Sequence, residues 1–137
     1  MSEENRALMR RFYEEVMNEG NLAAIDELCA PGFIDHSPSP GQAPGAEGLK
    51  QAFAAMGSAF RDIRVTVDHM VAEGDTVAAH ITFRGTQTRE LMGIPPSGRE
   101  AVLRVSDIVR FAGGKAVERW GVEDMSGIFP PPGSPPA

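Results

Sequence analysis

The stretch that decides the fold is residues 100–124, which read EAVLRVSDIVRFAGGKAVERWGVED. Apolar and polar residues alternate on both sides of Gly113-Gly114, as they do in half-buried β-strands. A glycine pair suits a two-residue type I′ turn, because both central residues of that turn have positive φ. The stretch therefore predicts a β-hairpin, with one strand from about Glu100 to Phe111 and the next from Lys115 to Asp124.

The predicted turn also sets the register of this hairpin. It pairs Ala112 with Lys115 and brings Arg104 against Glu123, which is a favourable cross-strand pair. A three-residue turn would put Val122 beside Arg104 and lose that match. The opposite face is then expected to be largely apolar and to face the core; its members are Leu103, Val105, Asp107, Val109, Phe111, Trp120, Val122 and Asp124.

Asp107 and Asp124 are the two carboxyl groups on this predicted apolar face. A buried carboxyl group without partners is costly, so it is pushed toward its neutral form or finds a hydrogen-bond donor. Such an environment can tune a carboxyl group to act as a general acid or base near neutral pH. Either residue could instead only accept structural hydrogen bonds. The catalytic interpretation is favoured for Asp124, and the two interpretations are balanced for Asp107.

Two earlier strands are predicted from the same alternation. Their inward faces are expected to hold Ile63, Val65, Val67, His69 and Val71, followed by Val77, Ala79, Ile81 and Phe83. A three-residue turn around Gly74 would keep both sets on one face of the sheet. His69 is therefore expected to face the pocket or the core.

The N-terminal half has helical spacing instead. Helices are predicted from Ser2 to about Gly20, from Asn21 to Leu28 and from Ala46 to Phe60, with a short extended piece over residues 33–36 and a loop over 37–45. Helices gathered on one side of an antiparallel sheet define an α+β domain. We expect one domain over residues 1–129 and a disordered Pro-rich tail over 130–137.

Composition narrows the class of protein. The 137 residues carry a net charge of −6, which argues against nucleic acid or an anionic membrane as partner. Residues 1–20 lack the apolar run of a signal peptide, so we expect a cytoplasmic protein. Cys29 is the single cysteine and is expected to be a small buried apolar residue. The histidines lack metal-ligand spacing and the glycines match no nucleotide motif, so neither a metal nor an organic cofactor is expected.

Several motifs together resemble the SnoaL-like polyketide cyclase (ester cyclase) family of the NTF2-like superfold. They are Phe33-x-Asp35-His36, Gly93-Ile94-Pro95-Pro96-Ser97-Gly98-Arg99, and Gly114-Lys115-x-x-Glu118-x-Trp120-x-x-x-Asp124. The resemblance implies a cone, in which a strongly curved antiparallel sheet and three helices from the N-terminal half enclose a deep pocket. It also implies cofactor-free ring closure of a small hydrophobic carbonyl compound by an aldol reaction, with Asp124 at the position of the family's acid–base aspartate.

The remaining expectations concern the other site residues and the partners. Asp107 stands where the cyclases tend to carry a histidine. Asp107 or His36 would return the proton that Asp124 removes from the substrate. Because the family histidine is missing, a non-catalytic ligand-binding protein is the alternative. Substrate contacts are expected from Tyr13, Phe33, Asp35, His69, Val105 and Trp120. The outward strand face mixes apolar residues with charges, which suggests a homodimer through that face; the apolar residues are Met70, Ile108 and Val117, with Thr66 beside them.

Overall fold

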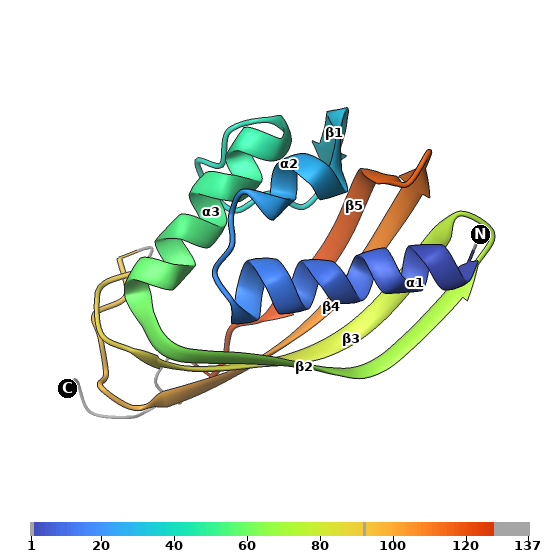
Figure 1. The fold of residues 1–137 in the computed structure, drawn as a ribbon. Helices are drawn as coiled ribbons and strands as arrows, with labels where there is room; N and C mark the ends of the chain where they lie inside the picture. Colours follow the sequence, from blue (N-terminus) through green and yellow to red (C-terminus); the bar gives the residue numbers. More distant parts are fainter. Residues whose placement is uncertain (1, 92, 128–137) are drawn as a thin grey trace.

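A curved sheet and a layer of helices on one side of it make up the fold in the computed structural model, which describes residues 2–91 and 93–127 (Figure 1). The strands are β1 (Cys29–Asp35), β2 (Phe60–Glu73), β3 (Thr76–Gln87), β4 (Glu100–Ala112) and β5 (Lys115–Asp124). The helices are α1 (Ser2–Arg11), its π-helical continuation η1 (Phe12–Asn18), α2 (Ala24–Leu28) and α3 (Gly45–Ala59). The α+β prediction is confirmed, and the predicted tail over 130–137 lies outside the described residues.

The sheet has the strand order β1-β5-β4-β3-β2. The predicted sheet is antiparallel, but one strand pair of the observed sheet is parallel. Strands β2 to β5 form an antiparallel meander, whereas β1 pairs with β5 in parallel. A parallel pair needs a long connection, and the chain between β1 and β5 supplies one that includes α3 and three strands. Strand β1 thereby carries Phe33 and Asp35 to the helical side of the sheet next to β5.

The core lies between the helices and the concave face of the sheet. The largest fully buried apolar side chains come from both layers: Ile25 and Leu28 from α2, and Val77, Ile81 and Phe83 from β3. Within residues 2–91 and 93–127, no helix is long and apolar enough to cross a membrane.

A β-bulge changes the faces of β5. The predicted turn is correct, because Ala112 pairs with Lys115 and Phe111 with Ala116. Arg110 then pairs with Glu118, which leaves Val117 as an extra residue in β5. One extra residue moves every later side chain to the other face of a strand.

The predicted register beyond the turn is therefore wrong. Arg104 pairs with Asp124 rather than with Glu123. The side chains expected inside, Trp120, Val122 and Asp124, are exposed on the outer face.

A second bulge changes the end of β2. Val67 pairs with Ile81 and His69 pairs with His80, which leaves Asp68 as the extra residue. The turn that follows has two residues, not three, because Glu73 pairs with Thr76. His69 is consequently exposed, and the expectation that it faces the pocket or core is wrong.

The outer face of the sheet holds exposed apolar side chains. Of the four residues expected there, Ile108 is 44% exposed and Thr66 is also exposed, whereas Met70 packs against the core and Val117 sits in the β5 bulge. The bulges add Val71, Trp120 and Val122 to the exposed apolar residues. A homodimer through this face stays a prediction.

Asn18, the last residue of η1, fastens the helical layer to the edge strand β2. Its amide oxygen accepts a hydrogen bond from the backbone N–H of Val65 at 2.6 Å, and its amide nitrogen donates to the carbonyl of the same residue at 3.1 Å. These two bonds use backbone groups that an edge strand would otherwise leave without a strand partner.

Replacing Asn18 with Ala should lower the free energy of unfolding by about 1–3 kcal/mol, because both backbone groups of Val65 lose their partner. Urea unfolding followed by circular dichroism measures this change. The matched control is Asn21→Ala, at an exposed asparagine, with an expected change within about 0.5 kcal/mol. Equal stability of the two variants would contradict the proposed role of Asn18.

Candidate active site

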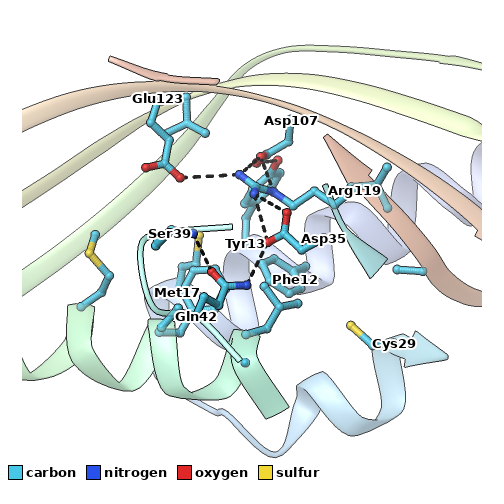
Figure 2. Close-up of a pocket in the computed structure, with 18 of the residues that line it drawn as sticks. Phe12, Tyr13, Met17, Cys29, Asp35, Ser39, Gln42, Asp107, Arg119 and Glu123 are labelled. Carbon is cyan, nitrogen blue, oxygen red and sulfur yellow. Dashed lines mark hydrogen bonds and ion pairs between the residues drawn. The ribbon is translucent and has the colours of Figure 1, made fainter. Parts of the chain in front are cut away.

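A cavity of about 320 Å³ lies between the helices and the concave face of the sheet. This volume is within the range of small-molecule sites. Most lining side chains are apolar and include Met9, Phe12, Met17, Phe53, Met56, Leu103, Val105 and Phe111. Most of the polar side chains lie together in one part of the lining, and Figure 2 shows how they approach one another: Tyr13, Asp35, Ser39, Gln42, Asp107, Arg119 and Glu123.

Asp107 of β4 is the buried acid of this polar cluster, with only 8% of its surface exposed. Its Oδ2 accepts a hydrogen bond from the hydroxyl of Tyr13 at 2.7 Å. Its Oδ1 accepts from Nε and Nη2 of Arg119 at 3.0 and 2.8 Å. The carboxylate is therefore held from the helical layer by η1 and from the sheet by β5.

The buried position of Tyr13 beside Asp107 changes the pKa of its hydroxyl group. Burial, followed by the negative charge of Asp107 and its hydrogen bond, raises the pKa of Tyr13 well above the ordinary value of 10.0. The phenol therefore stays protonated at neutral pH and can donate its hydrogen bond to Asp107. The π-helical turn of η1 carries this residue, and such turns are frequent at functional sites.

Arg119 of β5 joins two buried carboxylates. Besides its bonds to Asp107, its Nη1 donates to the Asp35 carboxylate at 3.1 and 3.3 Å and to the backbone carbonyl of Ser37 at 3.3 Å. Glu123 lies 3.6 Å from Nη2. Burial acts to lower the pKa of Arg119, but the charges of Asp107 and Asp35 outweigh it and hold that pKa above its ordinary value.

Gly121 makes the path of Arg119 possible. The two residues lie on the same face of β5, and the Arg119 side chain passes over Gly121 to reach Asp107, the strand partner of Gly121. A Cβ at position 121 would collide with Nη2 of Arg119 and lie 2.7 Å from its Cζ. The glycine therefore provides the space that the guanidinium group occupies.

The loop after β1 is fastened to the same cluster. The Asp35 carboxylate accepts hydrogen bonds from the backbone N–H of Ser37 at 2.9 Å and from the amide of Gln42 at 3.0 Å. Gln42 in turn accepts from the backbone N–H of Ser39 at 3.1 Å. The loop segment from Ser39 to Gln42 contributes to the cavity wall, so the ion pairs that hold Asp35 also hold part of the ligand site.

Five residues predicted for the site do line the cavity: Tyr13, Phe33, Asp35, Val105 and Asp107. Cys29 also lines it, and its burial agrees with the expected apolar role, since burial raises the pKa of its thiol to about 11. Among the described residues, no three His, Cys, Asp or Glu side chains are grouped as metal ligands.

The structure places the other four predicted residues away from the cavity lining. His36 stacks on Trp120 with ring centroids 4.8 Å apart, and both are exposed, as is His69. Asp124 is exposed, and hydrogen bonds from Ser126 lower its pKa. The prediction that Asp124 lies on the pocket face is wrong because the β5 bulge turns it outward.

The sequence patterns miss four residues of the site, which are Gln42, Arg119, Glu123 and the glycine that leaves room for the guanidinium group, Gly121. Regular alternation from the turn puts Arg119 and Glu123 on the outer face. The burial of Asp107 could have indicated the correct register. A buried carboxylate needs a cation, and only the shifted register brings Arg119 to Asp107.

Alkaline titration tests the environment of Tyr13, which is the single tyrosine of the chain. Its pKa is raised in the folded state, so its contribution to stability is complete below about pH 10 and declines as the pH rises further. Phenolate absorbance should therefore stay absent near pH 10–11 in the folded protein and appear only with unfolding. Half-ionisation near pH 10 in protein that is still folded would contradict the buried Tyr13–Asp107 bond.

Replacing Arg119 with Met should lower the free energy of unfolding by about 3 kcal/mol, because two buried carboxylates lose their shared cation. Met keeps the aliphatic stem, so lost packing contributes little. Arg104→Met, at an exposed position of β4, is the matched control and should be nearly neutral. Chemical unfolding measures both variants, and an unchanged Arg119→Met protein would exclude the ion pairs as a structural requirement.

Comparisons with known proteins agree on one family. The sequence profile described as "SnoaL-like polyketide cyclase" matches residues 7–130, and none of the curated proteins matches the chain. TsrD from Streptomyces laurentii is 31% identical, with a TM-score of 0.82 and 90% of each chain covered. IdmH from Streptomyces antibioticus, a proposed polyketide cyclase, is 32% identical, with a TM-score of 0.77 and 90% of this chain and 94% of that chain covered. AclR from Streptomyces galilaeus, a proposed hydroxylase, is 28% identical, with a TM-score of 0.81 and 93% of each chain covered. The predicted NTF2-like fold is confirmed, and the chain belongs to the SnoaL-like polyketide cyclase family.

Proposed function

We propose that the protein is a cofactor-free cyclase in which Asp107 is the general base toward a small hydrophobic carbonyl compound. The observation that carries this proposal is a buried carboxylate at the wall of an apolar cavity, with a phenol and a guanidinium as its neighbours. Membership in the cyclase family and the likeness to IdmH support ring closure as the reaction.

The hydrogen bonds favour Asp107 over Asp35 as the base. Both oxygens of Asp35 accept two bonds each, with Ser37, Gln42 and Arg119 as donors. In Asp107, Oδ1 accepts two bonds from Arg119, whereas Oδ2 accepts one from Tyr13. A carboxylate offers about four acceptor sites, so Oδ2 of Asp107 keeps one for a substrate proton.

The same neighbours can serve both steps of the reaction. Asp107 takes the proton from the carbon beside a carbonyl group and becomes neutral, and the electron pair of that C–H bond forms an enolate. Once Asp107 is neutral, the positive charge of Arg119 and the hydroxyl dipole of Tyr13 can stabilise the negative charge that has moved to the enolate oxygen. The enolate carbon bonds to a second carbonyl carbon, and the resulting alkoxide takes the proton back from Asp107, so the reaction is an isomerisation overall.

A second candidate function is ligand binding without chemistry. It is favoured by the three hydrogen bonds that Asp107 accepts, because they stabilise the carboxylate that a base must give up. The two functions differ in whether the protein accelerates proton removal from a bound ligand.

Proton exchange on a probe ligand separates these functions. Methyl naphthyl ketone is dissolved in D2O with the protein, and loss of the methyl proton signal is followed by NMR. Asp107→Asn should slow the catalysed exchange about 100-fold or more, because Asn cannot accept the proton, while the affinity for the ketone changes little. Asp124→Asn is the matched control, since this carboxylate is exposed on the other face, and it should stay within about twofold of the unmodified protein.

Each outcome has a distinct meaning. Binding of the ketone without accelerated exchange would favour the non-catalytic function. Loss of exchange in Asp124→Asn but not in Asp107→Asn would restore the sequence-based assignment and overturn the proposal.

A further inference from the structure

We infer that Glu123 makes this cavity select ligands that bring a hydrogen-bond donor, above all an ammonium group, and discriminate against carboxylates. The inference rests on the proposed function in one respect, because both take this cavity as the ligand site. It concerns equilibrium binding, however, and does not require that the protein catalyses a reaction.

The charges that line the cavity are unequal. Asp35, Asp107 and Glu123 are acidic, and Arg119 is the only Lys, Arg or His among the described residues of the lining. With all four groups ionised, the formal charge of the lining is −2. A ligand that brings a further negative charge is repelled by this excess, and a positive one is attracted.

Arg119 cannot offset the excess for an incoming carboxylate, because its donors are already in use. Its Nε and Nη2 donate to Asp107, and its Nη1 donates to Asp35 and to the carbonyl of Ser37. The remaining side of Nη2 is directed toward Glu123. A guanidinium has five N–H groups, so four are in use as donors and the fifth faces the negative charge of Glu123, which repels a ligand anion.

Glu123 is the acid with unused acceptor capacity. It lies 3.6 Å from Arg119, beyond hydrogen-bond distance, and its side chain is 42% exposed, whereas that of Asp35 is 5% exposed. Figure 2 shows it apart from Tyr13 and Asp35, at the other edge of the cluster. An ammonium or hydroxyl group on a ligand can reach its carboxylate without breaking an existing hydrogen bond.

Neutral donors should also be accepted. Ser39, Gln42 and Gln51 line the cavity and can both donate and accept hydrogen bonds. An uncharged hydroxyl therefore has partners even without Glu123, and the charge of Glu123 should matter little for it. The expected order of affinity is amine, then alcohol, then acid.

Three probes with one aromatic body test this order: naphthylmethylamine, naphthylmethanol and naphthoate, with binding measured by isothermal calorimetry at pH 7. The unmodified protein should bind the amine more tightly than the acid by roughly tenfold or more. In Glu123→Gln the amine should lose about fivefold, the acid should gain, and the alcohol should stay within about twofold. Asp124→Asn, the neighbouring acid on the outer face, is the matched control and should preserve the order.

Equal binding of amine and acid to the unmodified protein would overturn the inference. An amine-to-acid ratio that does not change in Glu123→Gln would also overturn it, as would a cavity that binds none of the three probes. The proton-exchange experiment can fail while this order holds, and the order can fail while exchange depends on Asp107, so the two proposals are tested separately. Unfolding curves of both variants confirm that the fold is intact.

Discussion

The ion pairs of one guanidinium with two buried carboxylates determine most of the geometry of this protein. Arg119 lies between Asp107 of the central strand β4 and Asp35 of the edge strand β1. The side chains of Arg119, Asp107 and Asp35 are 16%, 10% and 5% exposed. Any of these charges would be costly to bury alone, and removing one partner leaves the others unpaired. The group therefore ties β1, β4 and β5 together, with Tyr13 linking the helical layer to the same point.

These ion pairs contribute more to the exact placement of the Asp107 carboxylate than to the stability of the fold. A buried ion pair roughly balances its desolvation against its attraction, so similar stability could be reached with apolar residues. What apolar residues could not provide is a carboxylate held by directional bonds at the wall of an apolar cavity. The loop from Ser37 to Gln42 shares these bonds, so the shape of the cavity and the position of the base depend on one network.

The sequence predicts the layers of this fold well because they follow from periodicity alone. The α+β class, the long strands and the tight turn at Gly113-Gly114 all follow from patterns of apolar residues and glycines. The bulges at Asp68 and Val117 leave no such signal, since an extra residue in a strand looks like any other residue. The sequence predicts Tyr13, Asp35 and Asp107 correctly because they lie on other elements than the bulged strand β5. Arg119 and Glu123 follow the bulge, so regular alternation puts them on the wrong face.

The bulge at Val117 means that β5 encodes two different pocket walls. One is the wall in use, with Arg119, Gly121 and Glu123, and the other is the set now facing outward, with Trp120, Val122 and Asp124. Regular pairing with Val117 retained would exchange the two, because Val117 would then pair with Arg110 and Trp120 with Asp107. Deletion of Val117 would instead fix the present wall, because Glu118 would follow Ala116 directly and still pair with Arg110.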